Sequence, residues 1–186
     1  MSVLAGFLRG SQVVMLSSVL LITSCGGDSA ERTYAVPSDL CGLDVPKDLY
    51  DPAFPPGSQL AVEDSFDLSG PLTLLGDTCT IEVDGSQVVH SATYAWESFD
   101  KVSVGEGEGE AVGGEFNAMV WPGAAMAQAP CTLAVSESHH MTESFMVSLE
   151  MTHPEGDEES VEVLSQLIQP YMAAAIDGVP CEERAA

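Results

Sequence analysis

Basic side chains are nearly absent from this chain of 186 residues. Five Lys and Arg stand against 29 Asp and Glu, which gives a formal net charge of −24 at pH 7. Nucleic-acid binding and docking on anionic lipid head groups both need clustered Lys or Arg, so the composition argues against both. Apolar residues still make up 45% of the chain. That share suffices for a packed core and excludes a disordered acidic tail.

Familiar catalytic and metal-binding motifs are also missing. The sequence has no G-x-S-x-G, no H-E-x-x-H and no D-x-D-x-D-G loop. It has no C-x-x-C pair and no His at ligand spacing from a Cys, which argues against zinc. We expect the acidic run Glu155–Glu159 to be a solvated helix start rather than a cation site. The sequence therefore nominates no catalytic residue, no metal ligand and no cofactor.

The longest apolar segment lies near the N-terminus and is short. Val13–Ile22 follows a start with one Arg and no acid, and small residues come after it. That order is typical of a secretory signal. A spanning helix needs about 20 apolar residues. Residues 10–27 carry no charge, so a spanning anchor stays as an alternative, beside a plain signal peptide.

The residues after this segment indicate a lipid anchor. Ile22, Thr23 and Ser24 precede Cys25, and this pattern resembles the lipobox of bacterial lipoproteins. The resemblance implies cleavage after Ser24 and a diacylglycerol on the Cys25 sulfur, at the extracytoplasmic face of the cell membrane. Two acyl chains already hold a protein stably. We therefore predict a signal peptide over 1–24, a flexible tether over 25–38 and one domain over 39–183.

Four cysteines remain once the lipidation residue is set aside: Cys41, Cys79, Cys131 and Cys181. An even number in an exported protein implies two disulfides. Three pairings are possible. We favour Cys41–Cys79 with Cys131–Cys181, because these pairs join neighbouring elements of the sequence.

A hairpin is predicted around Asp84-Gly85, a strong two-residue turn signal. Counting outward from this turn pairs Ile81 with Val88 and Cys79 with His90. His90 is then expected on the core face, partly buried and neutral, rather than as a ligand. The strand starts at Cys79 and Cys131 share the pattern C-T-[I/L]-x-V. This similarity fits either a decayed internal duplication or two independent strands with the same local structural requirements.

A second hairpin is predicted over residues 131–151. Phe145, Val147, Leu149 and Met151 alternate with more polar positions, which is the pattern of a strand buried on one face. Its tip holds Ser138-His139-His140. Adjacent His on a strand point to opposite faces and chelate poorly, so we expect exposed loop residues.

An amphipathic helix is predicted from Asp157 to about Ile176. One stripe is apolar (Val161, Leu164, Ile168, Met172, Ala175), and the opposite stripe is polar (Glu158, Glu162, Ser165, Gln169). Pro170 should kink this helix, and Gly178 can end it. The predicted fold class is α+β: an antiparallel sheet of two or more hairpins with this helix packed on one face.

Two further features bear on binding. Trp121, at a predicted strand end, is the candidate exposed aromatic for stacking on a sugar or peptide, whereas Trp96 falls on the predicted core face. The stretch Gly105–Glu110 alternates Gly and Glu. Its carboxylates would repel phosphate, so we expect a mobile acidic loop rather than a phosphate-binding loop.

The layout after the signal resembles small uncharacterised lipoproteins of actinobacteria. The motifs that carry the resemblance are Cys41-Gly42-Leu43, Cys79 to Gly85, Ala129-Pro130-Cys131 and Val179-Pro180-Cys181. The resemblance implies the compartment and the disulfides but no activity. The leading hypothesis is a membrane-tethered binding or protein-interaction module of the cell envelope, with no specific ligand assigned and an envelope protein as the candidate partner. The alternatives are an envelope enzyme acting on cell-wall glycan or peptide, and an acidic cation-buffering surface protein.

Overall fold

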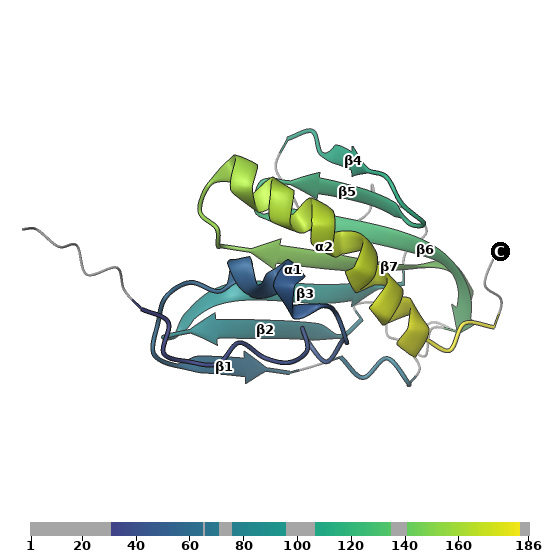
Figure 1. The fold of residues 1–186 in the computed structure, drawn as a ribbon. Helices are drawn as coiled ribbons and strands as arrows, with labels where there is room; N and C mark the ends of the chain where they lie inside the picture. Colours follow the sequence, from purple (N-terminus) through teal and green to yellow (C-terminus); the bar gives the residue numbers. More distant parts are fainter. Residues whose placement is uncertain (1–30, 65, 71–75, 96–106, 135–140, 183–186) are drawn as a thin grey trace, which may run out of the picture.

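The computed structural model describes residues 31–64, 66–70, 76–95, 107–134 and 141–182 (Figure 1). These ranges hold seven strands: β1 (Leu60–Glu63), β2 (Thr78–Val83), β3 (Ser86–Tyr94), β4 (Glu110–Val112), β5 (Asn117–Trp121), β6 (Ala124–Ala134) and β7 (Met141–Met151). They also hold the helices α1 (Lys47–Tyr50) and α2 (Asp157–Gly178), and a 3-10 turn, η1 (Asp51–Ala53).

All seven described strands form one antiparallel sheet in the order β1-β2-β3-β7-β6-β5-β4. Each half is a meander of sequential neighbours, and β3 pairs with β7 where the halves meet. The helix α2 crosses one face of this sheet diagonally, with its start above the β5–β6 end (Figure 1). The predicted α+β class is confirmed, as is the C-terminal helix on the sheet.

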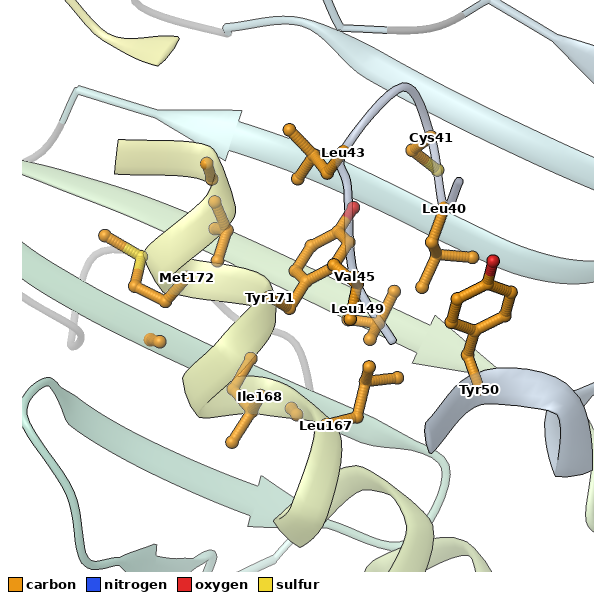
Figure 2. Close-up of a cluster of buried hydrophobic side chains, with 14 of the residues drawn as sticks. Leu40, Cys41, Leu43, Val45, Tyr50, Leu149, Leu167, Ile168, Tyr171 and Met172 are labelled. Carbon is orange, nitrogen blue, oxygen red and sulfur yellow. The ribbon is translucent and has the colours of Figure 1, made fainter. Parts of the chain in front are cut away.

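The core lies between α2 and the sheet (Figure 2). Leu164, Ile168, Met172 and Ala175 of the predicted stripe are buried, and Val161 is partly buried. From the sheet, the alternating set on β7 meets them: Phe145, Val147, Leu149 and Met151. The helix continues through Pro170 and ends at Gly178, the residue predicted to be able to end it.

The N-terminal segment covers the same face of the sheet beside α2. It contains the short helix α1, which contacts α2. The Tyr50 hydroxyl donates to Pro37 O over 2.9 Å, and the Tyr50 and Phe54 rings meet edge to face. This layer closes the half of the core that α2 leaves open.

The predicted tether is too long at its C-terminal end. Arg32 donates to the Asp51 carboxylate at 3.0 Å and also to Phe54 O, and Thr33 N donates to Gly57 O at 2.8 Å. Val36 is buried. Residues 32–38 are therefore part of the packed domain, because they fill the surface beside α1.

Both favoured disulfides are present. Cys41–Cys79 joins the N-terminal layer to β2, and Cys131–Cys181 joins the segment after α2 to β6. Beside the second bond, Glu182 N donates to Thr132 O at 2.7 Å. The disulfides thus hold the N-terminal layer and the segment that follows α2 against the sheet.

The predicted register of the first hairpin is wrong beyond its turn. A bulge shifts the pairing, so Ile81 lies opposite Val89 and Cys79 lies opposite Ser91. The extra residue is Val88, and both Val88 and Val89 are buried. An extra residue reverses which side chains face the core. The bulge moves His90 to the face opposite α2.

Strand β7 is buried on both faces, not on one as its pattern indicated. Met146 and Ser148, which point away from α2, have no exposed surface. The position of β7 between β3 and β6 in the middle of the sheet explains part of this burial. The rest comes from a second apolar cluster on that face.

Gln169 was expected on the solvent-facing stripe of α2, and it is not free there. Its side-chain Oε1 accepts from Phe116 N at 3.1 Å, and its Nε2 donates to Phe116 O at 2.9 Å. The side-chain amide therefore satisfies both backbone groups of Phe116, as a paired strand would. It fixes the start of β5 against the helix.

Candidate functional site

The face of the sheet opposite α2 (below, the open face) carries the candidate site. A row of polar side chains crosses its β1–β7 half: Glu63, Thr80, His90 and Glu150 are successive cross-strand neighbours. Thr80 Oγ1 and His90 Nδ1 are hydrogen bonded at 3.1 Å. His90 and Glu150 are half-buried, so the row lies at the surface without being fully solvated.

The other half of the open face is apolar. Trp121, Ala124, Met126 and Met146 form a cluster separate from the main core, and Tyr94 and Met119 pack against it. The Ser148 hydroxyl donates to the Tyr94 hydroxyl at 3.5 Å. The polar row and this cluster are adjacent, because Ala124 of the cluster pairs with Glu150 of the row.

Trp121 is not the exposed aromatic that the sequence nominated. Only 9% of the residue's surface is exposed, and its Nε1 donates to Gly107 O at 3.3 Å. A Cβ added to Gly109 would lie 2.5 Å from the indole ring, so the backbone of the Gly/Glu stretch lies directly against Trp121. Part of that stretch is thus packed on the protein, and Glu110 already belongs to β4.

Two carboxyl groups near the start of β2 have shifted acidities. Burial raises the pKa of Asp77, and the negative charge of Asp67 raises it further. Hydrogen bonds from Ser69 lower the pKa of Asp67. The Asp77 backbone is held on β3, because Asp77 N donates to Thr93 Oγ1 at 2.8 Å. Pairs of acids whose pKa values are pushed apart can divide acid and base roles.

A third carboxylate, Asp84, organises the β2–β3 turn. Its oxygens accept from the Ser58 hydroxyl at 2.8 Å, from Ser58 N and from Gln59 N. These bonds lower the pKa of Asp84, with the Ser58 side chain contributing most. The carboxylate joins the turn to the strand entering β1, which is a structural role. The turn position of Asp84 follows from the Asp84-Gly85 motif, but its bonds from Ser58 and Gln59 arise from long-range pairing, as does the position of Asp77 near Asp67.

Of the other residues considered from the sequence, some are exposed and some lie outside the described residues. Glu155–Glu159 are all exposed at the start of α2, as a solvated helix start requires. Cys25, Trp96 and Ser138-His139-His140 lie outside the described residues. Within the described ranges, no three His, Cys, Asp or Glu side chains gather in a way that would hold a metal ion. In the same ranges, no helix has the length and apolar character that crossing a bilayer requires.

Comparisons with protein-family models, with curated proteins and with solved structures found no match for this chain.

Proposed function

We propose that this protein is a lipid-anchored binding module of the bacterial cell envelope, attached through Cys25 and engaging an envelope protein. The observation that carries the proposal is that Arg32, shortly after Cys25 in the sequence, already belongs to the folded domain. Seven residue steps separate these positions, and a chain spans at most about 3.5 Å per residue, or about 25 Å. A lipid on Cys25 would keep the domain close to the membrane surface.

The attachment point also orients the domain. Arg32 and Thr33 lie beside Gly57, and the next residue, Ser58, is bonded to Asp84 at the β2–β3 turn. A lipid on Cys25 would therefore attach the domain from the side of the β2–β3 turn. The opposite end, with the Cys131–Cys181 disulfide, points away from the attachment (Figure 1).

The charge distribution favours a partner with a basic surface. The described ranges contain two basic residues, and both are engaged in the N-terminal layer: Arg32 with Asp51, and Lys47 through a bond to Val36 O at 3.0 Å. On α2 the acids Asp157, Glu158 and Glu162 are exposed, and the helix has no Lys or Arg. Anionic lipid repels such a surface, whereas a cationic protein surface attracts it.

Cross-linking in the native cells, followed by purification and identification of what is bound, tests this function. Two controls are matched to it: Cys25→Ser, which removes the anchor, and residues 1–31 fused to an unrelated domain, which keeps only the anchor. We expect one discrete envelope protein, recovered with the intact chain and with neither control. Recovery with the anchor-only fusion, or no protein partner at all, would overturn the proposal.

The split acidities of Asp67 and Asp77 favour one second candidate, an envelope hydrolase of glycan or peptide. Asp77 would be the acid, because burial raises its pKa, and Asp67 the ionised partner. Incubation of the purified protein with cell-wall fragments tests this reading. Activity that Asp77→Asn abolishes, and whose alkaline limb Asp67→Asn moves to lower pH by removing the charge that raises the Asp77 pKa, would establish the enzyme. No bond cleavage would exclude it for those substrates.

A further inference from the structure

Three methionine side chains lie on the open face, on three adjacent strands. Met119 of β5 lies directly opposite Met126 of β6. Met126 lies opposite Ser148 of β7, and Met146 stands two residues before Ser148 on the same face. Directly opposed side chains have Cβ atoms about 5 Å apart, and diagonal neighbours about 7 Å, within reach of long side chains.

The three residues belong to one packed cluster. Met126 and Met146 are buried with Trp121 and Ala124, and Met119 packs against them while staying partly exposed. Their strand neighbours point the other way, into the core under α2: Ala118, Val120, Ala125, Ala127, Phe145 and Val147. The thioethers are thus concentrated on one face, and Met119 provides a path from solvent.

The chemistry of this cluster is selective. Thioether sulfur is a soft ligand that favours Cu(I), whereas Ca²⁺ and Mg²⁺ require oxygen ligands. The six residues of the cluster carry no carboxylate, and Glu150 of the polar row lies opposite Ala124 at its edge. The three sulfurs themselves therefore offer a hard divalent cation no ligand. The rings of Trp121 and Tyr94 border it, and an aromatic face attracts a cation. The large negative charge of the chain raises the local cation concentration.

We propose that Met119, Met126 and Met146 form a binding site for a soft monovalent metal cation, Cu(I), with Ag(I) as its chemical equivalent. The site is independent of the partner-binding function proposed above. The competing explanation is that the methionines only fill space, since Met adapts to irregular cores. The two explanations predict the same fold and differ in what a soft cation does to these three side chains.

A titration with silver nitrate in chloride-free buffer separates them. The full chain carries Cys25→Ser, because a free thiol would itself bind Ag(I), and the methionine methyl groups are labelled with ¹³C. The expected result is one bound Ag(I), with shifts at the methyls of Met119, Met126 and Met146. Met172, which α2 buries in the main core, is the internal control, and its methyl signal stays unshifted. Cu(I), supplied without oxygen in acetonitrile, should shift the same three methyls.

Substitution by leucine removes the sulfur at nearly constant volume. Met119→Leu and Met126→Leu should each weaken Ag(I) binding by about tenfold or more, since even outer-shell changes at metal sites cost that much. Met172→Leu is the matched control and should bind as the parent does. Unshifted methyls at the three positions, unchanged affinity when all three are Leu, or Ag(I) binding without Cu(I) binding would each overturn the site. A far-ultraviolet spectrum confirms that every variant is folded.

Discussion

Tyr171 of α2 donates its hydroxyl proton to Ser91 Oγ of β3 over 2.8 Å, although the two residues are 80 positions apart in the chain. Ser91 Oγ in turn donates to Ser148 O of β7 at 2.6 Å. All three residues are buried. This relay fastens the helix to both strands at the centre of the sheet, where the two meanders join. Burial raises the pKa of Tyr171 and keeps its hydroxyl protonated as a donor.

Removing the donor should cost less than removing the acceptor. Tyr171→Phe deletes one hydrogen bond and should lower the free energy of unfolding by about 1 kcal/mol. Ser91→Ala leaves the Tyr171 hydroxyl buried without its acceptor and should cost about 1–3 kcal/mol. Urea denaturation of both variants measures the difference. If Ser91→Ala costs less than Tyr171→Phe, the hydroxyl of Tyr171 does not depend on Ser91.

The amide of Gln169 should stabilise the protein by bonding the backbone of Phe116. Gln169→Ala removes both bonds and should lower the free energy of unfolding by about 1–3 kcal/mol. Gln166→Ala is the matched control, since Gln166 is exposed on the same helix. It should change stability by less than about 0.5 kcal/mol. Equal effects of the two substitutions, measured by the same denaturation, would contradict the pairing.

The contact between Gly109 and Trp121 should tolerate no side chain. Gly109→Ala places a Cβ 2.5 Å from the indole, so the ring must move, at a cost of about 1–3 kcal/mol. Gly113→Ala adds a Cβ with no atom within 4 Å and is the control. Tryptophan fluorescence, in a chain carrying Trp96→Phe, should shift to longer wavelength for Gly109→Ala alone. An unshifted spectrum would mean that the segment at Gly109 does not cover Trp121.

The Asp84 carboxylate should make stability depend on pH in the acid range. Its pKa in the folded protein lies below the ordinary value of 3.8, so its ionised form stabilises the fold above that value. The contribution is lost as pH falls through the lower, folded pKa. Asp84→Asn keeps a residue that accepts the positive φ of this turn but removes the charge.

Unfolding free energies of the parent and of Asp84→Asn, measured from neutral pH down to pH 2, test this contribution. The difference between the two proteins should be largest above pH 3.8 and should shrink below it. A difference that does not change with pH would show that the charge of Asp84 contributes nothing to folding.

The parts of the fold set by local chemistry could be predicted from the sequence. Asp84-Gly85 marks a turn, the stripe through Leu164 and Ile168 marks the buried side of α2, and the pattern from Phe145 to Met151 marks the core face of β7. The bulge at Val88 could not be predicted, because no Gly or Pro signals it. The pairing of β3 with β7 is also a long-range choice with no local signature.

The candidate site was less predictable for the same reason. Trp121 ends a strand, where exposure is the ordinary expectation, and it is buried because Gly107 and Gly109 return to it from earlier in the chain. His90 changed faces because of a single extra residue upstream. The methionine cluster was missed because Met119, Met126 and Met146 become neighbours only through the order of three strands. Each of the three alternates with core-facing residues on its strand, and this alternation is the sequence feature that places them on the same face of the sheet.

Mass spectrometry of the mature N-terminus shows whether Cys25 carries a lipid. The protein is extracted from its native membrane with detergent, and its N-terminal peptide is sequenced. We expect a chain that begins at Cys25 and carries a diacylglyceryl group on sulfur. Cys25→Ser should lack the lipid and leave the membrane fraction. A mature chain without lipid, or one cleaved at another bond, would contradict the anchored module.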